Sequence, residues 1–247
     1  YRGRVRVAKL AKEKGVERYV LASTCSVYGF QPGILDENSP VRPLTVYARA
    51  SYLAEREILP LADGRFVATA LRQATVYGFS YRMRFDLAVN GMVRSLFKTG
   101  VIKVMRDGRQ WRPFVHVKDT SRAFIEVLES EPELVNGQVF NVGSDEQNIQ
   151  LFDLAKIVAE ACGQEFRYEW YGSPDQRSYR VSFEKIKRTL GYKVRYTIPD
   201  GAREVWRALE EGLLDPDDPR TITVKWYKHL MEMHEFLKSI EIEGKLL

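Results

Sequence analysis

The sequence predicts an α/β protein built on a doubly wound parallel sheet. Amphipathic helical segments alternate with short apolar strands along the chain, and glycines stand where helices should stop. A repeated order of helix, glycine and buried strand is typical of parallel sheets that are covered by helices on both faces. With 247 residues, the chain is long enough for one large core, or for one core with a smaller lobe.

The first third of the chain shows this alternation most clearly. Apolar residues recur at helical spacing up to Gly15, which is the usual helix-stopping position, and a short apolar run follows it. A segment rich in proline, glycine and aspartate predicts a loop, and Pro60 should stop the next helix. The expected elements are a helix over 5–14, a strand over 18–23, a loop over 29–46, a helix over 46–59 and a strand over 65–72.

The remaining two thirds continue the pattern with shorter elements. The Asp107-Gly108 pair predicts a turn, and Gly163 is placed to end a helix. The tail alternates short elements and finishes in a highly charged helical stretch. The expected elements are helices over 87–98, 119–129, 148–162 and 223–240, and strands over 101–105, 113–117 and 138–143.

Composition excludes several classes of function. The net charge is +5, but acidic residues are interleaved with the basic ones, so we expect no nucleic-acid partner. No apolar run approaches the roughly 20 residues that cross a bilayer, and no apolar segment follows Tyr1, so we expect no membrane span and no signal peptide. Cys25 and Cys162 suggest neither a disulfide framework nor a metal site. These features favour the cytoplasm, and the modest positive charge suits a substrate that carries a diphosphate.

Hydroxyl side chains gather at the end of the first predicted strand. Ser23, Thr24 and Ser26 lie in the stretch Leu21 to Gly29, and the chain turns at its end. In open α/β sheets ligands bind outside the carboxyl ends of the strands, where such hydroxyls can orient a substrate oxygen. The alternative is a polar strand end that makes local bonds between side chains and backbone. This stretch alone does not decide between the two.

Tyr47 favours the functional interpretation. With it, the sequence resembles the extended short-chain dehydrogenase/reductases, and in particular the NAD-dependent nucleotide-sugar epimerases and dehydratases. That pattern is a strand ending in Ser/Thr-x-x-x-Tyr-Gly, a proline-bearing loop, and Tyr-x-x-x-Lys on a helix. Further matches in the family's order are Leu71-Arg72 to Val76-Tyr77-Gly78, Asp107-Gly108 to Lys118-Asp119, Phe140-Asn141-Val142-Gly143 and Asp175-Gln176-Arg177-Ser178-Tyr179. Together the matches run from residue 1 to about 195.

The resemblance implies a role for each matched side chain. Thr24 would bond the sugar oxygen that is oxidised, and Tyr47 would take the hydroxyl proton while hydride leaves for the nicotinamide. Arg112 and Arg177 would hold the substrate diphosphate, for which a guanidinium is suited. The residues implied for the cofactor, NAD or alternatively NADP, are Ser23, Tyr47, Ser51, Thr75 and Val76. Those implied for a nucleotide-diphosphate sugar are Thr24, Ser26, Thr75, Met105, Arg112 and Arg177.

His116 and Asp119 are interpreted as structural. Tyr47 could instead be a core or surface residue, the arginines could be surface residues, and Met105 could belong to the core.

Position 51 departs from the family pattern, because Ser51 stands where the family has lysine. Tyr47 and Ser51 are four residues apart and therefore share a helix face. In the family the lysine bonds the nicotinamide ribose, and its charge favours the ionised tyrosine. Either the chain is impaired, or Ser51 is an engineered change, or another cation enters from elsewhere. Restoring lysine with Ser51→Lys should raise turnover by orders of magnitude.

A second departure concerns the cofactor loop. No Gly-x-x-Gly-x-x-Gly phosphate loop occurs in the sequence, and the resemblance begins at the helix before the Ser/Thr strand. We therefore expect the N-terminal part of the family fold to be absent, which leaves a partial doubly wound, Rossmann-like sheet with a smaller C-terminal substrate-binding lobe. The expected division is 1–78 and 111–143 for the remainder of the NAD-binding domain, and 79–110 and 144–247 for the nucleotide-sugar lobe.

A third departure bears on the reaction. Dehydratases of the family carry Asp-Glu after the catalytic threonine, but here Cys25 and Ser26 follow Thr24, which argues against a 4,6-dehydratase. Cys25 has no histidine near it in sequence and is interpreted as a packed thiol.

The favoured function is an NAD-dependent epimerase that oxidises and reduces C4, similar to UDP-glucose 4-epimerases. The alternatives are a 4-ketoreductase that uses NADPH, and a catalytically silent relative that binds nucleotide sugar. A homodimer is expected through the helix over 46–59 and the one before the Ser/Thr strand.

Overall fold

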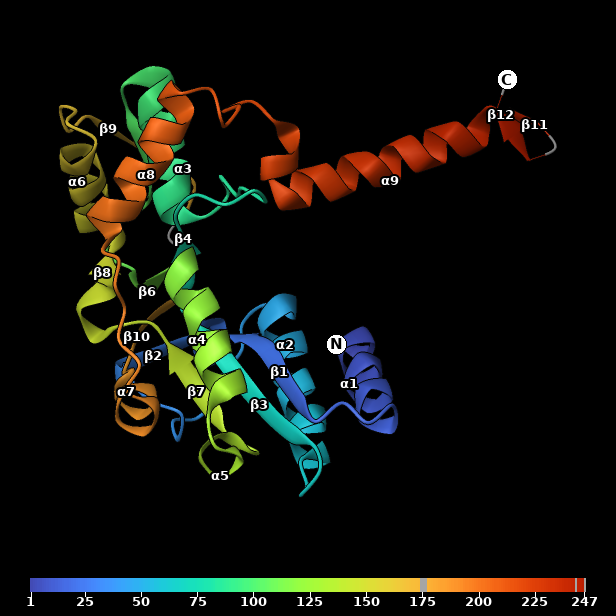
Figure 1. The fold of residues 1–247 in the computed structure, drawn as a ribbon. Coiled ribbons are helices and arrows are strands. Elements are labelled where there is room, and N and C mark those ends of the chain that lie inside the picture. The colour runs from blue at the N-terminus through green and yellow to red at the C-terminus, as the bar shows by residue number, and fades with distance from the viewer. Residues whose placement is uncertain (174–176, 243, 247) are drawn as a thin grey trace.

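A computed structural model describes residues 1–173, 177–242 and 244–246. A parallel sheet with the strand order β1-β3-β7 lies at the centre of its larger part (Figure 1). The strands are β1 (Arg18–Thr24), β3 (Val67–Gln73) and β7 (Val139–Val142). Thr24 is paired with Gln73 and, one strand further, Gln73 with Val142, so the three carboxyl ends meet at one edge. Side chains that follow these strands are therefore brought together.

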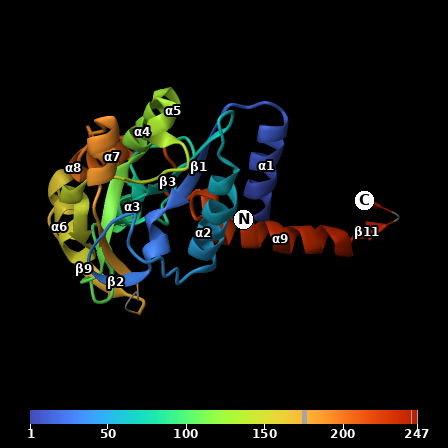
Figure 2. The ribbon, with the colours of Figure 1, turned by 90° about the horizontal axis from the view of Figure 1, so that it is seen from below.

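Helices cover both faces of this sheet, as Figures 1 and 2 show. On one face lie α1 (Arg2–Glu13) and α2 (Val46–Ile58), whose Val5, Ala8, Ala54 and Ile58 pack against Leu21, Phe66, Ala68 and Ala70. On the other face lies α4 (Val117–Glu129), whose Ala123 and Val127 belong to a cluster with Leu71, Phe140 and Val142. The predicted doubly wound α/β class is confirmed.

A second group of elements forms its own apolar core. Here α3 (Ala88–Thr99), α6 (Leu151–Ala161) and α8 (Ile198–Glu210) pack together with the parallel strand pair β5 (Ile102–Met105) and β9 (Tyr168–Tyr171). The sheet β4-β6-β8 connects this group to the central sheet, and its strands are β4 (Thr75–Tyr77), β6 (Trp111–His116) and β8 (Asn148–Gln150). The core contains, among others, Val93, Leu96, Val104, Leu154, Val158, Ala202 and Val205.

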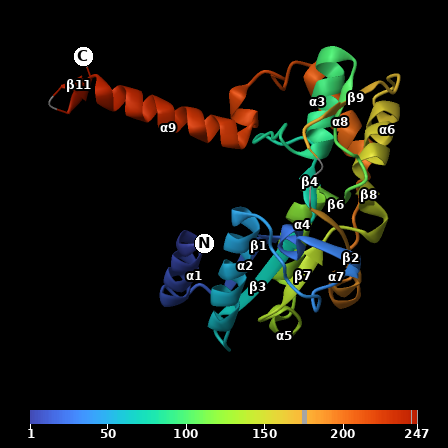
Figure 3. The ribbon, with the colours of Figure 1, turned by 180° about the vertical axis from the view of Figure 1, so that it is seen from behind.

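Shorter elements complete the chain. They are η1 (Cys25–Tyr28), β2 (Phe30–Leu35), η2 (Leu59–Leu61), α5 (Pro132–Val135), η3 (Asp145–Gln147), β10 (Ser178–Val181), α7 (Glu184–Leu190), η4 (Pro219–Thr221), α9 (Thr223–Ser239), β11 (Glu241–Ile242) and β12 (Lys245–Leu246). The helix α9 extends away from both groups, and Figures 1 and 3 show it standing apart from them. Among the described residues no helix combines the length and apolarity that crossing a bilayer requires.

Three expectations about secondary structure are wrong. The predicted loop over 29–46 contains β2, which pairs in parallel with β10 from the far end of the chain. The helix predicted over 148–162 begins only at Leu151, because Asn148–Gln150 forms β8 and pairs with β6 in antiparallel fashion. The tail also holds the long helix α8, which the short elements expected there do not include. In each case contacts with distant residues decide the local structure.

Candidate active site

The carboxyl end of β1 carries Thr24, the first predicted catalytic residue. It is 7% exposed, and its Oγ1 caps η1 by accepting a hydrogen bond of 3.1 Å from the backbone N–H of Ser26, the second residue of η1. This is the local bond that the alternative interpretation expects. Within the described part of the chain the Thr24 hydroxyl has no acceptor for its own hydrogen. Thr24 can therefore still donate a hydrogen bond to a ligand oxygen.

Tyr47 lies in the first turn of α2. The helix begins here because the side chain of Thr45 caps it, accepting a hydrogen bond of 3.1 Å from the backbone N–H of Ala48. The Tyr47 side chain is 56% exposed, and within the described residues it makes no hydrogen bond. The α2 helix packs against β1 and η1, the elements that carry Thr24 and Ser26. The phenol is thus exposed to solvent and is not part of the core.

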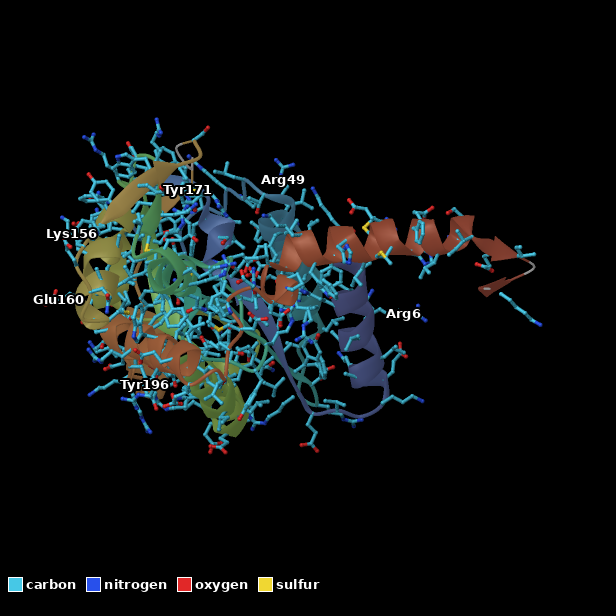
Figure 4. The ribbon with its side chains drawn as sticks, turned by 90° about the horizontal axis from the view of Figure 1, so that it is seen from above. Arg6, Arg49, Lys156, Glu160, Tyr171 and Tyr196 are labelled. Atoms are coloured by element: carbon cyan, nitrogen blue, oxygen red, sulfur yellow. The ribbon has the colours of Figure 1, made fainter. Side chains whose placement is uncertain are left out.

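Ser51, one turn further along the same face of α2, is fully buried and contacts a cation. Nη1 of Arg4, in the first turn of α1, lies 3.2 Å from Ser51 Oγ and 3.5 Å from the carbonyl oxygen of Ala22. Arg6 of the same helix points away from the body of the molecule instead (Figure 4). A guanidinium therefore occupies the surroundings of position 51, although residue 51 itself is neutral. This arrangement matches the third account of Ser51, in which a cation enters from another element.

A buried ion pair holds α2 against the sheet. Glu55, four residues after Ser51, receives hydrogen bonds from Arg72 of β3: Nη2 to Oε2 at 2.7 Å and Nε to Oε1 at 3.0 Å. Ser23 also donates its hydroxyl to Glu55, and Arg72 Nη1 donates to the hydroxyl of Tyr28 at 3.1 Å. Tyr28 in turn donates to the side-chain oxygen of Asn141 at 2.9 Å. The network connects α2, β1, η1, β3 and β7 beneath the strand ends.

Burial governs the ionisation of this network. Burial disfavours the charge of Arg72, but hydrogen bonds and the charge of Glu55 more than offset it, so the pKa of Arg72 is raised. Burial likewise raises the pKa of Tyr28 and of the Cys25 thiol well above their ordinary values, with Arg72 opposing both shifts. Cys25 is fully buried and its Sγ lies 3.0 Å from the carbonyl oxygen of Arg72. The interpretation of Cys25 as a packed thiol is confirmed.

The two arginines predicted to bind phosphate are neighbours in space. Arg112 is 8% exposed, and its guanidinium donates a hydrogen bond to the backbone oxygen of Arg177 and another, of 2.9 Å, to that of Trp111. The guanidinium also lies over the ring of Tyr179, 5.6 Å from its centroid. The Tyr179 hydroxyl is 3.4 Å from Ser26 Oγ, which leads back to the turn after Thr24. Positions 174–176, which include Asp175 and Gln176 of the motif, lie outside the described residues.

The other predicted binding residues divide between this edge and the core. Thr75 and Val76 follow β3 directly and are half-buried in β4, paired with Phe114 and Val115. Met105 ends β5, opposite Tyr171, and packs partly buried against the core of the second group. Ser23 and Ser51 are buried, and their hydroxyls are engaged by Glu55 and Arg4 respectively. These two serines therefore lie behind the exposed surface that presents Tyr47.

His116 and Asp119 support the fold, as the sequence suggests. The Asp119 carboxylate accepts the backbone N–H groups of Arg195 and Tyr196, each at 3.0 Å, which ties the segment before α8 to the start of α4. The His116 ring is fully buried and lies 2.9 Å from a carboxylate oxygen of Glu204 on α8. Burial lowers the pKa of His116, although Glu204 opposes that shift. Both residues join the start of α4 to α8 and the segment before it.

A hollow elsewhere on the surface is a poorer candidate. A depression of about 810 Å³ opens at the amino ends of β1 and β3, lined in part by Gly15, Arg18, Gly64 and Asn136. Parallel sheets bind ligands at the opposite, carboxyl ends of their strands. Its rim mixes basic and acidic side chains, and none of the predicted site residues contributes to it. The edge that carries Thr24, Tyr47 and Arg112 therefore stays the better candidate.

Sequence reasoning missed several residues that shape this edge. Arg4 lies on a helix before the motif, and Glu55, Arg72 and Tyr179 were not assigned roles. One signal was available for Glu55: it follows Tyr47 and Ser51 at steps of four residues, so all three share a helix face. Charged residues on a buried strand, such as Arg72 within β3, also call for a partner. No local pattern points to Arg4, whose contact depends on how α1 packs on α2.

Comparison with known proteins identifies the family and supports the fold. Residues 1–143 match the model of the NAD dependent epimerase/dehydratase family. The chain is 26% identical over 202 residues to an uncharacterized UDP-glucose epimerase of Bacillus subtilis (strain 168), covering 79% of this chain and 61% of the relative. It is 24% identical over 246 residues to the UDP-glucuronate 4-epimerase of Thermodesulfobacterium geofontis (strain OPF15), covering 97% and 67%. The solved structure of MoeE5 in complex with UDP-glucuronic acid and NAD superposes with a TM-score of 0.76 at 27% identity, covering 85% of this chain and 70% of that one.

Length differs between the chain and these relatives. The chain spans about three fifths to two thirds of the curated relatives that it matches, 61% of the first and 67% of the second. The match to the family model covers more than half of the chain.

Proposed function

The chain belongs to the NAD dependent epimerase/dehydratase family, and from this premise we propose that it acts in the NAD-dependent epimerisation of a nucleotide-diphosphate sugar at C4. The observation that carries the proposal is the exposed phenol of Tyr47 on α2, the helix that packs against the strand and turn carrying Thr24. Similar proteins support the substrate class, because MoeE5 was solved with UDP-glucuronic acid and NAD.

The residues at this edge suit such a ligand. Tyr47 is exposed and unengaged within the described chain, so its phenol can accept the proton of a sugar hydroxyl as a general base. Thr24 can donate its hydroxyl hydrogen to the same sugar oxygen. The Arg112 guanidinium bonds the backbone oxygen of Arg177, and the two arginines would bind the diphosphate. Ser26 is linked to Arg112 through Tyr179.

The residues present also fit a nicotinamide cofactor. Tyr47 offers a free hydroxyl, and Thr75 and Val76 lie only half-buried directly after β3. Ser23 and Ser51 would act from behind, because their hydroxyls are bonded to Glu55 and Arg4. When bound, NAD supplies the hydride acceptor that C4 oxidation requires, and NADP is the alternative.

We propose the division 1–78 and 111–143 for the cofactor domain and 79–110 and 144–247 for the sugar-nucleotide lobe, in which Met105 would contact the base. A homodimer through α1 and α2 and a cytoplasmic location stay predictions.

A direct test compares two tyrosines of the same helix. The chain is incubated with UDP-sugars and NAD, and epimer formation is followed by proton NMR. We expect Tyr47→Phe to lower turnover by roughly 10²- to 10⁴-fold, since it removes the general base. Tyr52→Phe, which alters a half-buried tyrosine one turn further along α2, should change turnover by less than about threefold. Equal activities of the two variants would exclude Tyr47 as the base.

The alternatives differ in how they hold a dinucleotide. Purified protein is denatured, and the supernatant is assayed for NAD and NADP. Retained NAD favours the epimerase, an NADPH that exchanges at each turnover favours a 4-ketoreductase, and no affinity for either favours the catalytically silent sugar-nucleotide binder. Cys25 and Ser26, which occupy the positions after Thr24, continue to argue against a 4,6-dehydratase.

A further inference from the structure

Tyr179 of β10 lies between the two ends of the candidate site and is only 4% exposed. β10 contacts β6, which carries Arg112, and it pairs with β2, which follows the turn that carries Ser26 (Figure 1). Ser178, the residue before Tyr179, fastens β10 to β6, because its Oγ accepts a hydrogen bond of 3.1 Å from the backbone N–H of Trp111. The fold thus places one buried tyrosine between the residue proposed for the diphosphate and a residue proposed for the sugar.

The pairing of β10 with β2 is irregular at Tyr179. Between two flanking register pairs, β10 has one residue, Tyr179, where β2 has the residues 31–33. The flanking pairs are Ser178 with Phe30 and Arg180 with Ile34. Gly33 in the longer segment has a φ of +81°, a left-handed conformation that favours glycine. Irregularities of this kind redirect a side chain and are frequent beside active sites. Tyr179 therefore has a direction that regular pairing would not give it.

The ring of Tyr179 supports the guanidinium of Arg112. The central carbon of the guanidinium lies 5.6 Å from the ring centroid, which is within the range of cation–π contacts. The backbone oxygens of Trp111 and Arg177 accept hydrogen bonds from the same guanidinium. Arg112 is largely buried, so few other orientations are open to it. The ring thus helps to fix the plane of the group that is proposed to bind the diphosphate.

The hydroxyl of Tyr179 reaches the other end of the site, where its oxygen lies 3.4 Å from Ser26 Oγ. Burial raises the pKa of Tyr179, so this hydroxyl keeps its hydrogen. Among the described residues Ser26 is its one acceptor, and a buried hydroxyl donates its hydrogen where it can. Tyr179 is therefore the donor. The contact is long for two hydroxyl groups, and such contacts shorten when a ligand fills the site.

Ser26 accepts this bond and keeps its own hydrogen. It is half-buried in the turn after β1, and its hydroxyl makes no other hydrogen bond within the described part of the chain. Thr24 has the same pattern, because its Oγ1 accepts the backbone N–H of Ser26 and its hydrogen stays available. The turn thus offers two hydroxyl hydrogens, for which the oxygens of a sugar are suitable acceptors.

We propose that Tyr179 is a positioning residue that couples the two ends of the substrate: its ring holds Arg112 for the diphosphate, and its hydroxyl sets Ser26 as a donor to the sugar. The inference rests on the proposed function, from which the ligands of Arg112 and Ser26 are taken. Because Tyr179 acts through two neighbours, its two effects can be separated by substitution. Phenylalanine keeps the ring and removes the hydroxyl, whereas leucine removes both.

Isothermal titration calorimetry measures the affinity of the full chain for UDP, UDP-glucose and UDP-glucuronic acid. Tyr179→Phe should leave the affinity for UDP within about twofold and weaken the better-bound sugar nucleotide by roughly two- to tenfold, because the bond from Ser26 to the sugar loses its orientation. Tyr179→Leu should weaken UDP itself as well, by roughly threefold or more, since Arg112 loses its aromatic support.

Ser26→Ala tests whether the hydroxyl acts through Ser26. The double variant Ser26→Ala/Tyr179→Phe should bind the sugar nucleotide no more weakly than Ser26→Ala alone, because both changes break one chain of bonds. Tyr192→Phe is the matched control, since it removes the hydroxyl of another buried tyrosine, which donates to the backbone oxygen of Asp119 at 3.1 Å. The control should alter no affinity by more than about twofold. Circular dichroism verifies that each variant is folded.

Three results overturn the inference. Tyr179→Phe binds every ligand as the unchanged chain does, or it weakens UDP as much as the sugar nucleotides, or its effect adds fully to that of Ser26→Ala. Each of them leaves the proposed epimerisation standing if the unchanged chain turns over a UDP-sugar and Tyr47→Phe does not. A chain that binds neither UDP nor its sugars overturns both proposals.

Discussion

The buried pair of Glu55 and Arg72 offers a quantitative test of how the active-site helix is held. The side chains are 3% and 5% exposed, and three hydrogen bonds of 2.7 to 3.2 Å join them. Removing one partner of a buried pair leaves an uncompensated charge and typically costs about 3–5 kcal/mol. We therefore expect Glu55→Met and Arg72→Met each to lower the free energy of unfolding by about 3–5 kcal/mol, a large part of the stability of an ordinary domain.

The double variant separates the pair from its surroundings. With both charges gone no unpaired charge remains, so Glu55→Met/Arg72→Met should cost much less than the sum of the single changes. The hydroxyls of Ser23 and Tyr28 would still lose a partner, which costs about 1–3 kcal/mol. The interaction energy from the cycle should therefore be at least about 2 kcal/mol.

Urea unfolding followed by far-ultraviolet circular dichroism provides the measurement. Lys156→Met serves as the matched control, because Lys156 and Asp153 form an ion pair whose side chains are 51% and 56% exposed. Exposed pairs contribute little, so the control should change stability by less than about 1 kcal/mol. Additive effects of Glu55→Met and Arg72→Met, or a cost no larger than that of Lys156→Met, would refute the reasoning.

Two further predictions concern charge at buried positions. Ser51→Lys places a second cation beside Arg4 at a fully buried site, so we expect it to destabilise the chain by roughly 2–4 kcal/mol. Arg4→Ala/Ser51→Lys should recover most of this loss in urea unfolding and should turn over UDP-sugar at least as fast as the unchanged chain; a stable and more active Ser51→Lys would contradict this. Burial lowers the pKa of His116 in the folded state, so protonation opposes folding and stability should fall as the pH drops below the ordinary range of histidine. His116→Asn should show a smaller loss of stability between pH 8 and pH 5.5, and an unchanged pH dependence would refute this account.

Local sequence patterns were sufficient for much of the fold. The helix predicted over 46–59 is α2, and the strand predicted over 18–23 is β1, because both are long enough and periodic enough to be decided by their own residues. By contrast, β2 exists through its pairing with β10, which lies more than a hundred residues later, and its own segment contains Pro32 and Gly33. A strand that depends on so distant a partner leaves no periodic signal.

The helix α8 was missed for a different reason, because two of its residues locally argue against a helix. Pro199 and Gly201 are residues that usually argue against a helix. Pro199, however, lies in the first turn, where its missing N–H has no partner to lose. Gly201 packs against Tyr77, and a Cβ there would lie only 2.4 Å from a ring carbon. The glycine is required by the contact between α8 and β4, so tertiary packing explains a residue that local propensity counts as unfavourable.

The part of the candidate site that lies within one local sequence motif could be predicted from the sequence. Thr24 and Tyr47 stand at fixed places in a recognisable motif, and the structure puts their elements, β1 and α2, in contact. Arg112 and Arg177 are 65 residues apart in sequence, and only the fold makes them neighbours. The proposed roles of these residues stay predictions until the variants are assayed.

Position 51 shows why a motif cannot be assessed from one residue. Taken alone, the serine removes a positive charge from the face of the helix that carries Tyr47, and this loss is the main support for a catalytically silent relative. The structure returns a positive charge to the same place from another helix, because Arg4 Nη1 lies 3.2 Å from Ser51 Oγ. A guanidinium stays charged at any physiological pH. A positive charge thus lies beside position 51 although the residue there is neutral, and the silent alternative stays a prediction until turnover is assayed. Measurable turnover in the unchanged chain would exclude the silent alternative, and a loss of that turnover in Arg4→Gln would show that Arg4 supplies the charge missing at position 51.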